Sequence, residues 1–252
     1  MSRTKTRSSL RLAALLLAAI TGGEALADGL RAHQVSYRTT FKGLSAGDLQ
    51  LTLKPGAEPG EWTYETRAHP SFLASFVISG NSLEHSAFVL TPSGVEPQRY
   101  QLTDGSGRRE KETDLTYEPA LGRVRGIVEG QPLELVIAPG TQDVMSIRAA
   151  PIADLSAGRE PREYTMLDGR ELKHYVYTKV GTARIATALG ELDTVIYRSD
   201  RKGANGRDRY WQYWYAPSLG YLPVRIEQRE DGATRMTFAL RTLTWLPAEG
   251  SR

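Results

Sequence analysis

A known catalytic pattern, G-x-S-x-G, matches residues 43–47 of this 252-residue chain. In hydrolases this pattern places a nucleophilic serine on a sharp turn between a strand and a helix. Here polar residues and leucines alternate over 48–53, directly after the motif, and such alternation is typical of a strand. The motif is therefore expected to form a hairpin turn and not a nucleophile.

Metal and thiol chemistry find little support. The chain has no cysteine, and its four histidines are scattered singly without the spacings of zinc sites: His33, His69, His85 and His174. His174 alternates with Leu172 and Val176, so it would face the interior as a hydrogen-bonded structural histidine. No metal and no other cofactor is expected.

The acidic residues do not define a catalytic pair either. Glu110, Glu112 and Asp114 fall on one face of an expected strand, with Arg109 and Lys111 on the other. Charges in this arrangement are typical of a solvated strand that resists edge-to-edge pairing. A glycosidase with two carboxylates across a cleft stays open, because such distances cannot be derived from sequence. The glycine-rich stretch 203–206 lies between expected strands, and no phosphate-binding fingerprint is present.

The densest cluster of aromatic residues is 210–215, Tyr-Trp-Gln-Tyr-Trp-Tyr. On a strand, Tyr210 and Trp214 would share one face, and Trp211, Tyr213 and Tyr215 the other. Aromatic residues favour strands, so ordinary sheet packing is one interpretation. The other is a lining for an apolar ligand, with phenol and indole donors at its rim. For that second interpretation the expected ligand-binding residues are Tyr210, Trp211, Tyr213, Trp214, Tyr215 and Phe238, with Trp214 and Phe238 in the pocket.

Most of the chain alternates polar and apolar residues with period two, interrupted by glycine, proline, asparagine and aspartate. The pattern predicts strands at 33–41, 47–54, 62–68, 82–91, 95–103, 109–117, 122–128, 132–138, 162–167, 171–180, 182–188, 191–198, 208–215, 221–229 and 234–245. One segment, 142–155, has helical spacing, with Thr141 or Asp143 as its cap and Pro151 expected to end or kink it. The predicted fold is mainly β: a single curved antiparallel sheet in an open or closed barrel, with this one short helix near the middle.

The N-terminal segment, residues 1–27, has the features of a secretory signal peptide. Four basic residues precede the apolar run 12–20, and the triplet 25–27, Ala-Leu-Ala, offers a cleavage site after Ala27. The run is too short to span a bilayer, and the later sequence contains no transmembrane helix. Without this segment acidic and basic residues balance, so nucleic acid is not an expected partner. The expected product is a single periplasmic β domain, 28–252.

Residues 213–217 and 219–226, Tyr-Trp-Tyr-Ala-Pro and Leu-Gly-Tyr-Leu-Pro-Val-Arg-Ile, resemble the C-terminal signature of the DUF3108 family of exported bacterial proteins. The hairpin around 37–47, the stretch 142–146 and the stretch 187–192 are similar as well, so the resemblance extends over most of 33–243. It implies a periplasmic, mainly β protein. It implies no catalytic residues.

Three functions remain in competition. The first is a non-catalytic periplasmic protein of the cell envelope that binds a lipid or another apolar small molecule in the curved sheet, with an envelope protein as a further partner. The second is an envelope hydrolase acting on glycan or lipid, which needs titratable groups converging in one cleft. The third is an outer-membrane β-barrel, although charges on both faces of the strand at 109–114 would be costly in a bilayer. A purely structural role is also open.

Overall fold

A computed structural model describes residues 29–70, 82–103, 112–202 and 208–247. The expected signal segment lies outside these residues. The described strands are β1 (His33–Phe41), β2 (Leu44–Pro55), β3 (Glu61–Pro70), β4 (Leu83–Thr91), β5 (Gly94–Thr103), β6 (Thr113–Glu118), β7 (Arg123–Val128), β8 (Gln131–Val136), β9 (Glu163–Asp168), β10 (Glu171–Thr187), β11 (Gly190–Arg201), β12 (Arg209–Ala216), β13 (Leu222–Glu230) and β14 (Ala233–Trp245). The helices are α1 (Ser146–Ser156) and two single 3-10 turns, η3 (Pro119–Leu121) and η4 (Pro217–Leu219).

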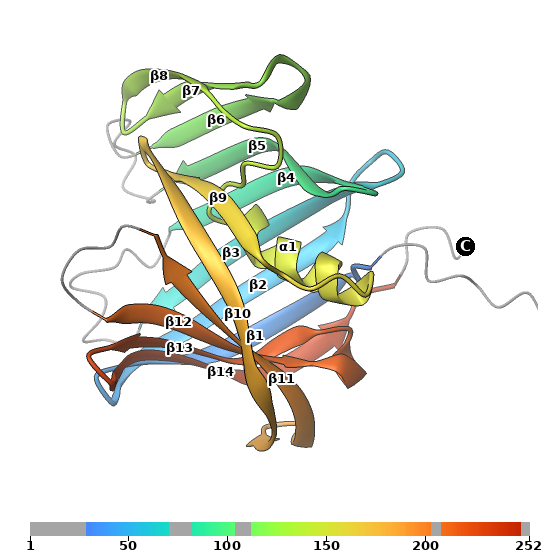
Figure 1. Cartoon of the computed structure of the whole chain (residues 1–252), viewed down its shortest axis with the longest axis vertical. Coiled ribbons are helices and arrows are strands. Elements are labelled where there is room, and N and C mark those ends of the chain that lie inside the picture. Colours follow the sequence, from blue (N-terminus) through green and yellow to red (C-terminus); the bar gives the residue numbers. More distant parts are fainter. Residues whose placement is uncertain (1–28, 71–81, 104–111, 203–207, 248–252) are drawn as a thin grey trace, which may run out of the picture.

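All fourteen strands belong to one antiparallel sheet, in the order β8-β7-β6-β5-β4-β3-β2-β1-β14-β13-β12-β11-β10-β9. The first and last strands of the chain pair with each other at its centre, which joins two meanders into one surface. The chain passes from one edge strand, β8, to the other, β9, through α1, which lies across the concave face (Figure 1). The predicted curved antiparallel sheet with one short helix is confirmed. The sheet is open, because no strand pairing joins β8 to β9 within the described ranges.

Irregular pairings bend the sheet. Six of the strand pairs contain a register shift, and a bulge increases the local bend and twist of its strand. One of these register shifts lies where the sequence predicted a break between two strands. The break predicted between 180 and 182 is a bulge at Lys179/Gly181 inside the single long strand β10, so two predicted strands are one.

The helix begins four residues later than predicted, because Gln142 forms a β-bridge with Met166 of β9 and a turn at 144–145 follows it. In that turn Oδ1 of Asp143 accepts hydrogen bonds from the amides of Met145 and Ser146, both at 2.7 Å. The hydroxyl of Thr141 instead donates to the carbonyl of Ala138. Pro151 does not end the helix, which continues to Ser156. Its neighbours 149, 150, 152 and 153 are buried, and their burial offsets the cost of a proline inside a helix, which is typically about 3 kcal/mol.

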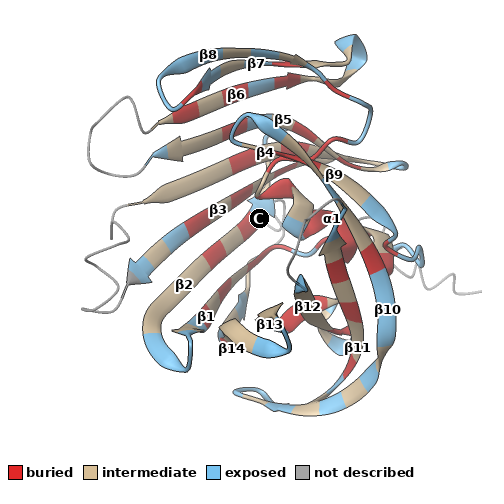
Figure 2. Cartoon of the chain, turned by 60° about the vertical axis from the view of Figure 1, so that its left-hand side comes forward, coloured by how far each residue is buried: buried red, intermediate tan, exposed pale blue. Residues whose placement is uncertain are grey.

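The helix fills part of the concave face. It packs against β4 and β5. At this contact Ala149 of the helix, Met145 just before it and Phe88 of β4 are fully buried. Buried residues alternate with exposed or half-buried ones along the strands, as expected when one face of a sheet is covered (Figure 2). Among the described residues, no helix has the length and apolar character to cross a membrane. Beside the helix, strands β10–β14 and β1–β3 form most of the concave surface that the helix does not cover.

Candidate functional site

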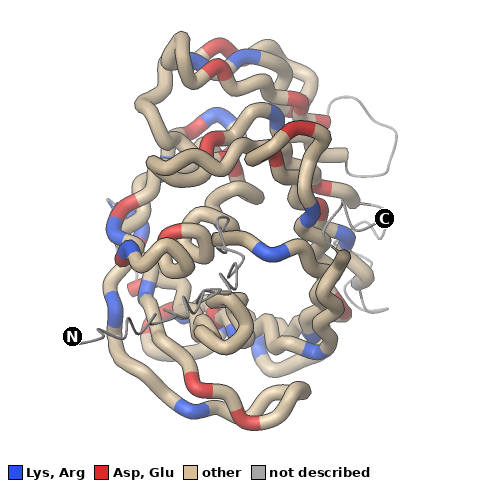
Figure 3. The backbone as a smooth tube through the Cα atoms, turned by 90° about the vertical axis from the view of Figure 1, so that its right-hand side faces the viewer, with Lys and Arg blue, Asp and Glu red and all other residues tan. Residues whose placement is uncertain are grey.

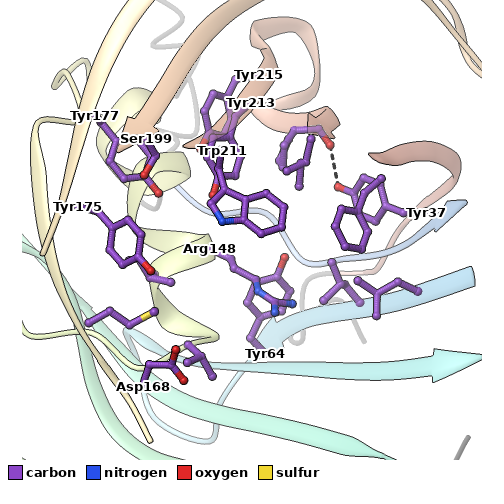
Figure 4. A pocket seen from close by; sticks show the side chains of 18 residues that line it. Tyr37, Tyr64, Arg148, Asp168, Tyr175, Tyr177, Ser199, Trp211, Tyr213 and Tyr215 are labelled. Atoms are coloured by element: carbon purple, nitrogen blue, oxygen red, sulfur yellow. Dashed lines mark hydrogen bonds between the residues drawn. The ribbon is translucent and has the colours of Figure 1, made fainter. Parts of the chain in front are cut away.

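A cavity of about 300 Å³ occupies this remaining concave surface. Strands β1, β2 and β3 form one side and β9–β14 form the other. Helix α1 contributes Ile147 and Arg148, and the turn before it contributes Val144. Aliphatic side chains such as Leu49 and Ile226 line the wall together with several tyrosines. Figure 4 shows the tyrosines from both sides of the cavity. The volume lies at the lower end of the range for small-molecule pockets in proteins.

Four of the six predicted ligand-binding residues line this cavity: Trp211, Tyr213, Tyr215 and Phe238. The rings of Tyr213 and Tyr215 stack with centroids 5.7 Å apart, and Trp211 lies 6.3 Å from Phe238 on β14. They come together because residues two apart on β12 share a face, and β13 and β14 continue the same curved surface.

Tyr210 and Trp214 do not line it, which corrects the expectation that Trp214 is in the pocket. Both point to the opposite face of β12, as strand alternation requires. There the guanidinium carbon of Arg198 lies 3.7 Å from the centroid of the Tyr210 ring. The guanidinium carbon of Arg225 lies 5.4 Å from the centroid of the Trp214 ring. Each makes a cation–π contact outside the cavity.

Four further tyrosines line the cavity and were not singled out from the sequence: Tyr37, Tyr64, Tyr175 and Tyr177. Tyr177 joins these four tyrosines to the aromatic residues of β12, because its ring stacks on Tyr213 with centroids 5.9 Å apart. The i, i+2 spacing of Tyr175 and Tyr177 on one strand was the available signal. Nothing local to Tyr37 or Tyr64 indicated that β1 and β3 would face β12.

Burial sets the protonation of these phenols. It raises the pKa of Tyr64 and of Tyr177 to about 12 and that of Tyr213 well above its usual value. The phenols therefore stay neutral at physiological pH and present hydrogen-bond donors to the cavity. Three of them are already engaged. The Tyr37 hydroxyl donates to the carbonyl of Pro223 at 2.7 Å, and the hydroxyls of Tyr177 and Tyr213 hydrogen-bond to each other.

Two charged residues line the cavity, Arg148 on α1 and Asp168 on β9. Asp168 forms an ion pair with Lys173 on β10. Elsewhere basic and acidic side chains are interspersed along the chain (Figure 3). In the part of the chain that the structure describes, no three His, Asp or Glu side chains gather as a set of metal ligands.

The other candidates for chemistry lie apart from the cavity. The G-x-S-x-G motif lies in the hairpin of β1 and β2, with Gly43 in the turn and residues 44–47 at the start of β2. His174 is exposed, contrary to the expectation that it faces inward, and its Nδ1 is 2.9 Å from Oγ1 of Thr165. On β6, Asp114 pairs with Arg99 of the neighbouring strand. Residues 104–111, which include Arg109, Glu110 and Lys111, and 203–206 lie outside the described residues.

The fold and its cavity define a class of protein: an open, strongly curved antiparallel sheet whose concave face is partly covered by one helix. Within that class the chain belongs to the DUF3108 family, described as a protein of unknown function, whose model matches residues 36–239. No curated protein sequence matches the chain.

Solved structures that are similar in shape include the following three. The complex of MucA and MucB from Pseudomonas aeruginosa has a TM-score of 0.40 and 12% identity, covering 89% of this chain and 55% of that chain. A protein described as exported, with a YmcC-like fold, from Bacteroides fragilis has a TM-score of 0.35 and 10% identity. The match covers 85% of this chain and 96% of that chain. A protein described as a lipoprotein from Parabacteroides distasonis has a TM-score of 0.34 and 10% identity. The match covers 86% of this chain and 97% of that chain. The chain spans about half the length of the first of these.

Proposed function

We propose that the protein is a non-catalytic binding protein of the periplasm that holds an apolar, lipid-like ligand in the concave cavity. The observation that carries this proposal is the lining of the cavity, in which aromatic and aliphatic side chains predominate. Transfer of apolar surface from water to such a lining is favourable in proportion to the area buried. The signal-like segment at 1–27 supports the periplasmic location.

The titratable groups favour binding over hydrolysis. A hydrolase needs groups that exchange protons near neutral pH and converge on the reacting bond. The carboxylate in the lining, Asp168, is paired with Lys173. The tyrosines have raised pKa values, about 12 for Tyr64 and Tyr177, and so remain protonated. The lining offers hydrogen-bond donors and apolar surface, which suit a ligand that is held and released unchanged.

The experiment is a titration of delipidated protein with a fluorescent fatty-acid probe, comparing two neighbouring substitutions on β12. Trp211→Ala removes a ring from the cavity, and affinity is expected to fall about tenfold or more, the equivalent of one large apolar side chain. Tyr210→Ala removes a ring from the opposite face and is the matched control, with no change expected.

Native mass spectrometry of the protein purified from its own host provides a second measurement. A co-purified lipid-sized mass is expected, and its loss from the Trp211→Ala protein but not from the Tyr210→Ala protein would support the cavity as its location. Absence of probe uptake by the native protein, or equal loss in the two variants, would contradict the proposal.

A further inference from the structure

Arg148 places a positive charge among the tyrosines of the cavity. It comes from the first half of α1, and its side chain extends toward Tyr64 (Figure 4). Burial raises the pKa of Tyr37, Tyr64 and Tyr213, and the charge of Arg148 opposes the rise in all three. One guanidinium thus acts on tyrosines from β1, β3 and β12.

The contacts of this guanidinium are long. Nη1 is 3.4 Å from the hydroxyl oxygen of Thr66, and Nη2 is 3.8 Å from Oε2 of Glu84, beyond hydrogen-bonding distance. By contrast, Arg99 donates to both oxygens of Asp114 at 3.0 and 2.8 Å. Glu84 therefore offsets the charge of Arg148 without saturating its donors.

The other charge in the lining is compensated more closely. The ammonium of Lys173 donates a hydrogen bond to Asp168 on the adjacent strand. The cavity therefore presents one loosely held cation and one paired anion. A guanidinium in surroundings of this kind binds carboxylate or phosphate oxygens through parallel, charge-assisted hydrogen bonds.

We propose that the ligand is a single-chain amphiphile with an anionic head group, a carboxylate or a phosphate, bound by Arg148 while the chain lies along the aromatic lining. This rests on the proposed function, because it assigns a head group to the apolar ligand of the same cavity. A volume of about 300 Å³ suits one chain better than two. The head group would accept hydrogen bonds from the two Arg148 nitrogens that make only long contacts with Thr66 and Glu84.

The test is displacement of the fluorescent fatty-acid probe at neutral pH by decanoate, decyl phosphate, decanol and inorganic phosphate. The three decyl compounds share chain length, so their differences report the head group. The better of the two anions is expected to bind about tenfold or more tightly than decanol, from the strength of hydrogen bonds to charged groups. Inorganic phosphate is expected not to displace the probe, and the order of decanoate and decyl phosphate identifies the head group.

Three variants assign the effect to its residue. Arg148→Gln is expected to reduce the anion-to-decanol ratio to about one, with decanol affinity retained. Glu84→Gln removes the competing acceptor and is expected to raise the affinity for the anions, which keeps the proposal testable should the first variant fold poorly. Arg99→Gln removes a guanidinium that pairs with Asp114 outside the lining, and the ratio should stay unchanged.

The outcomes separate the two proposals. Equal binding of the anions and decanol by the native protein, or a ratio that neither Arg148→Gln nor Glu84→Gln alters, would overturn the anionic head group and leave apolar binding intact. Failure of every decyl compound to displace the probe, or failure of the probe itself to bind, would contradict the proposed function. Displacement by inorganic phosphate alone would contradict both.

Discussion

The guanidinium of Arg170 donates a hydrogen bond to the carbonyl oxygen of Pro132 at 2.7 Å. Arg170 lies in the turn between β9 and β10, and Pro132 lies in β8, so this side chain links the hairpin at one end of the open sheet to the edge strand at the other. A second contact, to the carbonyl of Gln131 at 3.4 Å, extends the link. The open sheet is thereby held near closure at one corner.

Replacement of Arg170 by alanine should loosen this corner without unfolding the protein. Because Arg170 is exposed, the expected loss in the free energy of unfolding is below about 1 kcal/mol. Amide exchange in β8 should accelerate, since an edge strand opens locally when its restraints are removed. Arg241→Ala, which removes an exposed link to Asp48 of β2, is the control and should leave β8 unchanged. Identical exchange in β8 for both variants would show that Arg170 does not restrain the edge.

The hydrogen bond from the Tyr37 hydroxyl to the Pro223 carbonyl should contribute measurably to the stability of the folded protein. Tyr37 is 1% exposed, so Tyr37→Phe would leave a buried carbonyl without its donor at a cost of about 1–3 kcal/mol. Tyr117→Phe is the matched control, because the buried Tyr117 hydroxyl has no hydrogen-bond partner among the described residues. Denaturant unfolding should find the control neutral or slightly stabilising. A Tyr37→Phe protein as stable as the control would contradict the assignment.

Asp143 should make stability depend on pH in an unusual direction. Its carboxylate is fully buried, and desolvation raises its pKa to about 6, although bonds from Ser86, Met145 and Ser146 oppose the rise. The folded protein therefore binds this proton more tightly than the unfolded chain. The Asp143 contribution to the free energy of unfolding should fall by about 3 kcal/mol as pH rises from 3 to 7.

The measurement for Asp143 is the difference in unfolding free energy between the native protein and Asp143→Asn across this pH range. Asparagine keeps an acceptor for the amides of Met145 and Ser146 but does not titrate there. Subtraction removes the opposite effect of carboxylates such as Asp114, whose pKa Arg99 lowers. A difference that stays constant between pH 4 and 6 would be incompatible with the raised pKa.

Gly126 should be replaceable only at high cost. A Cβ there would lie 2.0 Å from the carbonyl oxygen of Asp114 on the adjacent strand, and the backbone φ is +151°. Gly181 has nearly the same φ, +149°, but open space around it, so Gly181→Ala measures backbone strain alone. We expect thermal or denaturant unfolding to show Gly126→Ala less stable than Gly181→Ala by about 1–3 kcal/mol. Equal stability of the two variants would mean that the strands separate freely at this point.

The sequence predicted most of the fold because alternation with period two is a local property. It also predicted the two faces of β12, with Trp211 and Trp214 on opposite sides. Alternation is symmetric between faces, however, and does not reveal which one becomes concave. The expectation that Trp214 enters the pocket was wrong for that reason. The prediction divided β10 at Gly181, because a bulge interrupts the alternation just as the end of a strand does.

The rest of the candidate site depends on long-range packing. Arg148 was not singled out, because its environment is set by where α1 lies on the sheet and not by its neighbours in the helix. Tyr37 and Tyr64 come from the other half of the chain and reach the cavity because β1 pairs with β14. Contacts of this kind join residues far apart in sequence, and no periodicity within one element encodes them.

The most direct test of the central claim is photo-crosslinking with a fatty acid that carries a diazirine on its chain, followed by peptide mapping. The account predicts label on residues that line the cavity, Trp211, Ile226 and Phe238 among them, and its loss when unlabelled fatty acid is added in excess. Label confined to the outer face, around Tyr210 and Trp214, or label that excess fatty acid fails to displace, would contradict it.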